Sequence, residues 1–104
     1  MNKLIAFGDS FTWGSELADV VASNDILYSN HTWPALLAKK HDMQYMCFAK
    51  PGAGNQTIAR TILSNIDKID TSDLVVINWT WIDRWDFYNL QDQDWVTVRP
   101  SSNV

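Results

Sequence analysis

Three short apolar runs, separated by segments long enough for helices, constrain the fold of this chain more than any other feature. The runs are Lys3 to Phe7, Gln44 to Ala49 and Leu74 to Trp79. Runs of this length, bounded by glycine, proline or polar residues, are typical of buried β-strands. Because helical crossovers join parallel strands, the order β-α-β-α-β predicts an α/β fold with a parallel sheet. The consecutive apolar residues of the third run suit a central strand covered on both faces.

The first connecting helix is predicted from its capping signals. Thr32 can cap a helix that begins at Trp33-Pro34, because proline is tolerated in the first turn. Lys39 and Lys40 would close its last turn, where positive charge suits the helix dipole. The side chains expected on its apolar face are Trp33, Leu36 and Leu37.

The second connecting helix has the clearest periodicity in the chain and begins at Asn55 or Thr57. Its predicted apolar stripe consists of Ile58, Ile62, Ile66 and Ile69, with Ala59 and Leu63 beside them. Arg60, Ser64, Asn65, Asp67 and Lys68 fall on the opposite face. The pattern within residues 16–22 favours a further helix only weakly.

Composition narrows the classes of function. The chain has 104 residues and a formal net charge of -4, which fits one domain over residues 1–104 without a basic nucleic-acid surface. Its apolar stretches are too short to cross a bilayer, and no signal-peptide core precedes Gly8, so we expect a cytoplasmic protein without membrane insertion. The single cysteine, Cys47, predicts a small buried apolar side chain. No metal or organic cofactor is implied.

The residues that follow the three strands suggest where chemistry takes place. Gly8-Asp9-Ser10, Gly52-Ala53-Gly54-Asn55 and Thr80-Trp81-Ile82-Asp83 would meet at the carboxyl edge of a parallel sheet. A serine on a tight turn after a buried strand can be aimed at a carbonyl carbon. The backbone N–H groups of glycines at the start of a helix are donors of the kind that form an oxyanion hole. We expect Asp9 chiefly to shape the loop by accepting N–H hydrogen bonds.

These segments resemble the SGNH/GDSL family of serine ester hydrolases over nearly the whole chain. Ile5-Ala6-Phe7-Gly8-Asp9-Ser10-Phe11-Thr12 is similar to the first family block, and Ala49-Lys50-Pro51-Gly52-Ala53-Gly54-Asn55 to the second. The resemblance implies a three-layer α/β/α, flavodoxin-like, doubly wound sheet of strand order 2-1-3-4-5, here with strands 1–3 only. It also implies hydrolysis of carboxylic esters, which include acetyl or short acyl esters, those of carbohydrates among them, and lipids.

The resemblance assigns roles to individual residues. Ser10 is the nucleophile, Asp9 belongs to the catalytic block, and the backbone N–H groups of Ser10 and Gly54 form the oxyanion hole. Gly52 is the alternative oxyanion glycine. The candidate substrate-binding residues are Gly52, Asn55, Asn78 and Thr80.

The chain departs from the family pattern in two places. Ile82 stands where the third block has an oxyanion asparagine, and neither Thr80 nor Asn78 is in register to replace it. The Asp-x-x-His block is absent, and neither His31 nor His41 is expected to be the base. A chain truncated at its C-terminus would explain this, with the catalytic histidine supplied from elsewhere. The exposed edge of the third strand would then be covered by the missing segment or by a second copy in a homo-oligomer.

Two other functions stay open. The missing base and Ile82 favour a catalytically inactive binding or structural module of the same fold. The other is a phosphate-binding domain that uses residues 52–55, although the chain lacks the usual phosphate-loop motifs. Trp79, Trp81 and Trp85 are expected to pack against the missing C-terminal half of the domain or to form an aromatic wall for a sugar or acyl group. Arg84 is expected at the surface, paired with Asp86 or with a substrate carboxylate.

Overall fold

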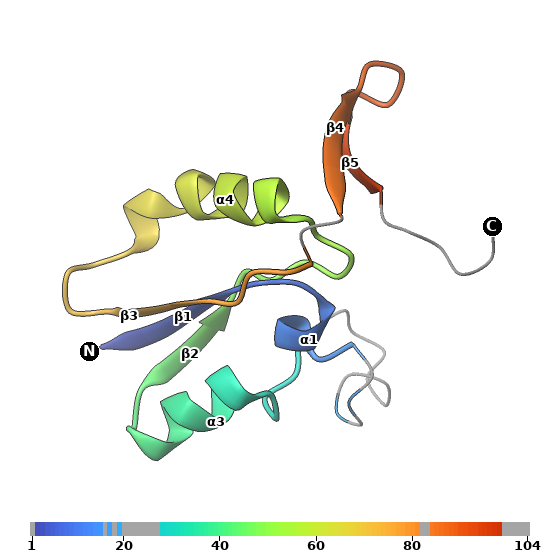
Figure 1. The fold of residues 1–104 in the computed structure, drawn as a ribbon. Coiled ribbons are helices and arrows are strands. Elements are labelled where there is room, and N and C mark those ends of the chain that lie inside the picture. Colours follow the sequence, from blue (N-terminus) through green and yellow to red (C-terminus); the bar gives the residue numbers. More distant parts are fainter. Residues whose placement is uncertain (1, 16, 18, 20–27, 82–83, 99–104) are drawn as a thin grey trace.

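A three-stranded parallel sheet organises the chain in the computed structural model, which describes residues 2–15, 17, 19, 28–81 and 84–98 (Figure 1). The strands are β1 (Lys3–Phe7), β2 (Gln44–Cys47) and β3 (Leu74–Ile77), in the order β2-β1-β3. Ile5 is in register with Met46 on one side and with Val75 on the other. The three predicted strands, their parallel direction and the mixed α/β class are therefore confirmed.

The side chains of β1 alternate between two core clusters, one on each face of the sheet. Ile5 and Phe7 pack with Ala53 and with Ile58 of helix α4 (Asn55–Ser64). On the other face, Leu4 and Ala6 pack with Ala38 of helix α3 (Trp33–Lys40). In Figure 1 the two helices accordingly lie on opposite sides of the sheet. Strand β1 pairs with a neighbour along each edge and is buried on both faces, so it is the central strand of this sheet.

Helix α3 begins where its sequence signals place it, but it buries a different face. Thr32 is the N-cap, and its hydroxyl accepts a hydrogen bond from the Ala35 N–H at 3.5 Å. The buried residues of α3 are Pro34, Ala35 and Ala38, whereas Trp33 and Leu36 are half exposed. The predicted apolar face was wrong for those two residues. Small side chains let α3 approach the sheet closely, and the larger ones then point outward.

The apolar stripe of the second helix is interrupted, because α4 ends at Ser64. A 3₁₀ turn, η1 (Ile66–Lys68), follows it. Ile58 is buried, and Ile62 and Ile69 pack against the same core, as predicted. The change of helical geometry after Ser64 turns Ile66 outward, so its predicted place in the stripe was wrong; Leu63 is also exposed.

A two-stranded antiparallel hairpin follows the sheet. Its strands are β4 (Trp85–Asn89) and β5 (Asp94–Val98), with Phe87 opposite Val96. The composition of residues 91–94 predicts a turn, and that of residues 95–98 a short strand, in agreement with the hairpin. In contrast, Trp85 of β4 was expected only as part of an aromatic cluster. In Figure 1 the hairpin rises from the carboxyl edge of the sheet, beside the start of α4. It therefore borders the candidate site.

Strand β3 is an edge strand in the described part of the chain, and β1 takes the central position. Val75 and Val76 pack against the two core clusters, so both faces of this run are covered in part. Leu74 is 42% and Ile77 39% exposed, so the predicted central position of this strand was wrong for the described part of the chain. Apolar composition alone does not separate a central strand from an edge strand, because both bury part of their surface. The weak helix prediction within residues 16–22 falls almost wholly outside the described residues.

No helix in the described ranges is long and apolar enough to cross a membrane. Cys47 is buried, as predicted, and burial raises the pKa of its thiol. The same ranges contain no group of three or more His, Cys, Asp or Glu side chains placed to hold a metal ion.

Asp73 fastens the beginnings of β1 and β3 and makes a pH-dependent contribution to stability. Its carboxylate accepts hydrogen bonds from the Lys3 N–H at 3.0 Å and the Asp70 N–H at 2.9 Å, and the Lys3 ammonium lies 2.9 Å away. The hydrogen bond from the Asp70 N–H, with those from Lys3, lowers the pKa of Asp73 to about 2. The folded state therefore favours the ionised carboxylate.

We expect Asp73→Asn to lower the Tm at pH 7, because the substitution removes this charge. In the wild type the stabilisation is complete above the unfolded pKa of about 3.9 and is lost as the pH falls toward 2. The Tm values of wild type and variant should therefore converge near pH 2 in thermal unfolding followed by circular dichroism. Asp67→Asn, at an exposed position on η1, serves as the control. A constant difference between Asp73→Asn and wild type from pH 7 to pH 2 would contradict this account.

Candidate functional site

Ser10 lies at the carboxyl end of the central strand, where the strand order of the sheet reverses. It is the first residue of the short helix α1 (Ser10–Trp13) and is partly exposed. Strand β2 lies on one side of β1 and β3 on the other. In open α/β sheets this is the position at which ligands bind.

The turn before Ser10 is closely packed. A Cβ atom on Gly8 would lie 2.3 Å from the Thr12 Oγ1 atom, so α1 approaches the end of β1 at a distance that only glycine allows. The Asn78 side-chain amide donates a hydrogen bond to this Thr12 hydroxyl at 3.1 Å. Asn78, a predicted substrate-binding residue, thus ties the end of β3 to α1.

Asp9 is buried and is the centre of a polar network. Its Oδ1 atom accepts a hydrogen bond from the Phe11 N–H at 3.0 Å, which caps α1, and its Oδ2 atom accepts one from the Thr80 hydroxyl at 2.6 Å. The prediction that Asp9 shapes the loop by accepting hydrogen bonds is confirmed. Thr80, predicted to bind substrate, is here a partner of Asp9.

Arg84 completes this network. Its guanidinium lies 3.4 Å from the Asp9 carboxylate and donates a hydrogen bond to the Ala53 carbonyl at 3.0 Å. The side chains of Arg84 and Asp9 are only 8% and 5% exposed. The predicted surface pairing of Arg84 with Asp86 was therefore wrong, because Arg84 points inward and joins the loops after β1 and β2.

The loop after β2 brings Gly52, Gly54 and Asn55 to the same edge of the sheet. Gly52 has a φ of 77°, a left-handed conformation that favours glycine. The Gly54 N–H donates a hydrogen bond to the Thr97 hydroxyl of β5 at 3.2 Å. The Asn55 amide donates to the Thr80 carbonyl at 3.2 Å and accepts from the Thr80 N–H at 2.7 Å. The polar groups of Gly54 and Asn55 are thus bonded within the protein.

Asp86 is a residue that sequence reasoning did not place in this region. Its carboxylate accepts hydrogen bonds from the Thr57 N–H at 2.7 Å and from the Thr97 hydroxyl, and so caps the start of α4. Burial opposes ionisation, but the hydrogen bonds from Thr97 and Thr57 outweigh it and lower the pKa of Asp86. A Cβ on Gly54 would lie 2.6 Å from this carboxylate. A carboxylate already in this position disfavours phosphate binding by residues 52–55.

The two histidines are not joined to Ser10. His41 ends α3 at the opposite, amino edge of the sheet. His31 precedes α3, and its backbone N–H donates a hydrogen bond to the Ser29 hydroxyl at 2.9 Å. Between described residues, no hydrogen bond links either imidazole to Ser10. Ile82, the residue at the position of the family asparagine, lies outside the described residues.

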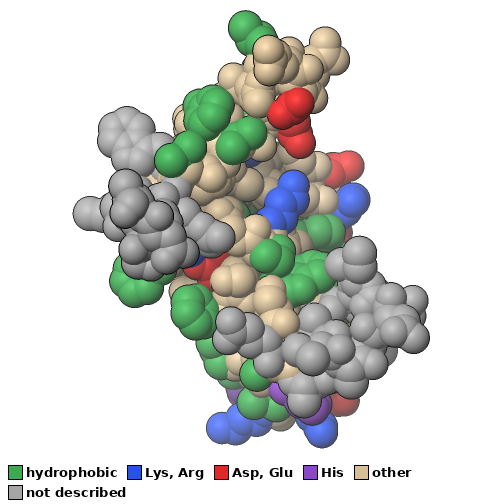
Figure 2. All heavy atoms as spheres, turned by 90° about the vertical axis from the view of Figure 1, so that its right-hand side faces the viewer, with side chains coloured by type: hydrophobic (Ala, Val, Ile, Leu, Met, Phe, Trp, Pro, Cys, Tyr) green, Lys and Arg blue, Asp and Glu red, His purple; other side chains and the backbone are tan. Residues whose placement is uncertain are grey.

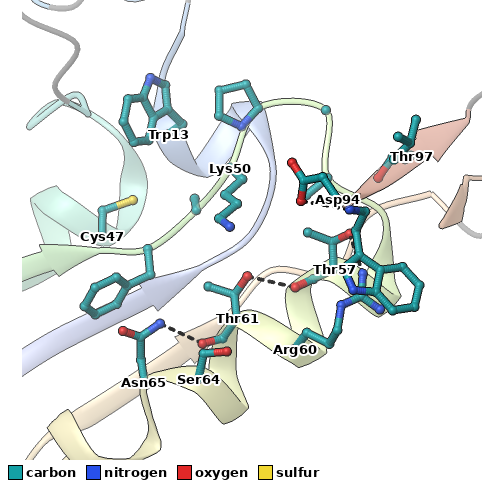
Figure 3. Close-up of a pocket in the computed structure, with 17 residues that line it drawn as sticks. Trp13, Cys47, Lys50, Thr57, Arg60, Thr61, Ser64, Asn65, Asp94 and Thr97 are labelled. Atoms are coloured by element: carbon teal, nitrogen blue, oxygen red, sulfur yellow. Dashed lines mark hydrogen bonds between the residues drawn. The ribbon is translucent and has the colours of Figure 1, made fainter. Parts of the chain in front are cut away.

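A pocket of about 960 Å³ lies beside this edge, and Ser10 does not line it. Its walls come from the loop after β2, one face of α4 and strand β5, with Trp13 of α1 at one end (Figure 3). Figure 2 views the carboxyl edge and shows basic side chains beside apolar ones below the hairpin. The predicted aromatic wall is not part of this pocket, since Trp79 and Trp81 are 53% and 62% exposed elsewhere.

Comparisons with known proteins gave no relative. No family model matches the chain, and neither a search of curated proteins nor a search of solved structures found a match.

Proposed function

We propose that this chain is a serine-dependent hydrolase of carboxylic esters, as its resemblance to SGNH/GDSL hydrolases implies. The observation that carries the proposal is the position of Ser10. It starts a short helix at the switch point of the sheet, and the residue before it is held by three hydrogen bonds. The strand order and the helices on both faces support the further proposal that the fold is a flavodoxin-like, three-layer, doubly wound sheet.

In the proposed reaction, the Ser10 hydroxyl attacks the ester carbonyl carbon and forms a tetrahedral intermediate. The Ser10 and Gly54 N–H groups stabilise the oxyanion, and the substrate oxygen replaces the Thr97 hydroxyl as acceptor of the Gly54 N–H. Losing one such donor typically costs about 2.7–4 kcal/mol of transition-state stabilisation. A histidine supplied from elsewhere carries the Ser10 proton to the leaving alcohol as the C–O bond breaks. Water then adds to the acyl-Ser10 carbonyl, which releases the acid and restores the Ser10 hydroxyl. The proposal assigns no described residue as general base. Acetyl and short acyl esters, including those of carbohydrates, are the proposed substrates.

We expect a fluorophosphonate probe to label wild-type protein and not Ser10→Ala, because the probe reacts with an activated serine hydroxyl. Intact-mass spectrometry measures the adduct, and peptide mapping locates it. Ser72→Ala, in an exposed turn at the other edge of the sheet, should be labelled like wild type. Hydrolysis of p-nitrophenyl acetate should fall to the uncatalysed rate in Ser10→Ala. Labelling that persists in Ser10→Ala would overturn the assignment.

A catalytically inactive binding or structural module is the second candidate function. One observation favours it: the Gly54 N–H and the Asn55 amide already have partners in Thr97 and Thr80. A site in which the oxyanion donors are permanently bonded within the protein stabilises no transition state. Folded wild-type protein that neither reacts with the probe nor hydrolyses the ester would favour this second function, or a chain that is inactive without the histidine of another segment.

A further inference from the structure

The pocket between α4 and β5 combines polar, aromatic and basic side chains. Thr61 and Ser64 lie on α4, Asn65 follows its last residue, and Lys50 lies on the loop after β2 (Figure 3). Trp95 of β5 also lines the pocket. Its volume is at the upper end of the range of about 300–1,000 Å³ that is typical of small-molecule sites. The size and the lining therefore suit a ligand that carries several hydrogen-bonding groups.

The charges that line this pocket are mainly positive, although the chain has a net charge of -4. Lys50 and Arg60 lie on different walls, and neither forms an ion pair with a carboxylate in the described part of the chain. Asp94 is the single acidic side chain of the lining, and its carboxylate accepts a hydrogen bond from the Trp95 N–H at 2.8 Å. Two cations that form no ion pair thus line the same pocket, although the charge of Arg60 also acts on the Asp86 carboxylate.

Arg60 is held in an orientation suited to an anion. Its guanidinium lies 3.5 Å from the centroid of the Trp95 ring, and its Nη2 atom donates a hydrogen bond to the Thr57 hydroxyl at 3.2 Å. Stacking on an indole leaves the edge of a guanidinium open, and this edge matches the paired oxygens of a carboxylate or phosphate. Because the Arg60 guanidinium is already held in place, its side chain would lose less conformational entropy when a ligand binds.

We infer that this pocket binds a small organic anion, with its carboxylate or phosphate oxygens between Arg60 and Lys50. The hydroxyl groups of the ligand lie along Ser64 and Asn65, where the Ser64 hydroxyl and the Asn65 side-chain oxygen have no hydrogen-bonded partner among described residues. This binding does not depend on the chemistry proposed for Ser10, since Ser10 is outside the pocket lining.

The test is an NMR titration of ¹⁵N-labelled protein with D-glucuronate, D-glucose and inorganic phosphate. Glucuronate is expected to cause saturable shifts of the Gly52 and Ala53 amides and the Trp95 indole N–H, whereas glucose, which has the same ring without the carboxylate, causes none. Saturable shifts of these signals with phosphate instead would assign the anionic group as phosphate. The same titration of Ser10→Ala should give unchanged affinity, which separates this inference from the proposed hydrolysis.

Two variants probe the cations. Lys50→Gln removes an exposed charge without a structural partner. Arg60→Lys keeps the positive charge but removes the paired N–H donors of the guanidinium. Each substitution should weaken binding by about tenfold or more. Lys39→Gln, an equal change of charge on α3 across the sheet, should bind like wild type. Equal shifts with glucose and glucuronate, no saturable shift with either anion, or equal weakening by Lys39→Gln and Lys50→Gln would overturn the inference.

Discussion

Replacement of Arg84 by methionine is expected to destabilise the fold by about 3–5 kcal/mol, because it leaves the Asp9 carboxylate buried without its cation. The two side chains are 8% and 5% exposed, so water screens their interaction little. The substitution also removes the hydrogen bond to the Ala53 carbonyl, which joins the loops after β1 and β2. Small domains have a free energy of unfolding of about 5–15 kcal/mol, so this loss is large. Urea unfolding measured at pH 7 gives its size.

A double-mutant cycle separates the ion pair from its surroundings. The double variant Asp9→Asn/Arg84→Met should lose clearly less free energy of unfolding than the two single variants together. The reason is that the double variant has no buried charge without a partner. Lys40→Met, at an exposed end of α3, is the control and should change stability by less than about 0.5 kcal/mol. An Arg84→Met variant as stable as the control, or additive effects in the cycle, would show that Asp9 does not depend on Arg84.

Phe7→Ala is expected to lower the free energy of unfolding by about 3–5 kcal/mol, the usual loss when a large aromatic side chain is removed from a core. Phe7 is 0% exposed, and its ring stacks on Phe48 with 5.7 Å between centroids. The cavity would lie directly before the Gly8 turn that places Ser10. Urea unfolding again measures the effect, and a lower yield of folded protein should accompany it.

Phe11→Ala is the matched control for this substitution. Phe11 is four positions away on α1 and is 71% exposed, so its removal should change stability by less than about 0.5 kcal/mol. Similar losses for the two variants would mean that Phe7 is not part of the core that supports the candidate site.

The sequence determines the elements whose signals are local. Four consecutive apolar residues followed by Gly8 are sufficient to define β1. The apolar run indicates a strand buried on both faces and the glycine marks its end, so both signals lie within one short segment. Thr32 and Pro34 likewise locate the start of α3, since capping acts within the first turn of a helix. The hydrogen bond that Asp9 accepts from the Phe11 N–H is local in the same sense, although helix α1 itself was not predicted. These features were predicted because each depends on neighbours only a few residues away.

The tertiary structure alone decides which groups meet at the candidate site. Arg84 reaches Asp9 from 75 positions away, and Asp86 caps α4 from 29 positions beyond Thr57. The outward position of Trp33 on α3 also depends on the fit of small side chains against the sheet. No local pattern encodes these contacts, because helix period and strand alternation describe an element by itself. The packing of the hairpin and the sheet edge determines them, since it brings charged and polar groups from distant segments within hydrogen-bonding distance.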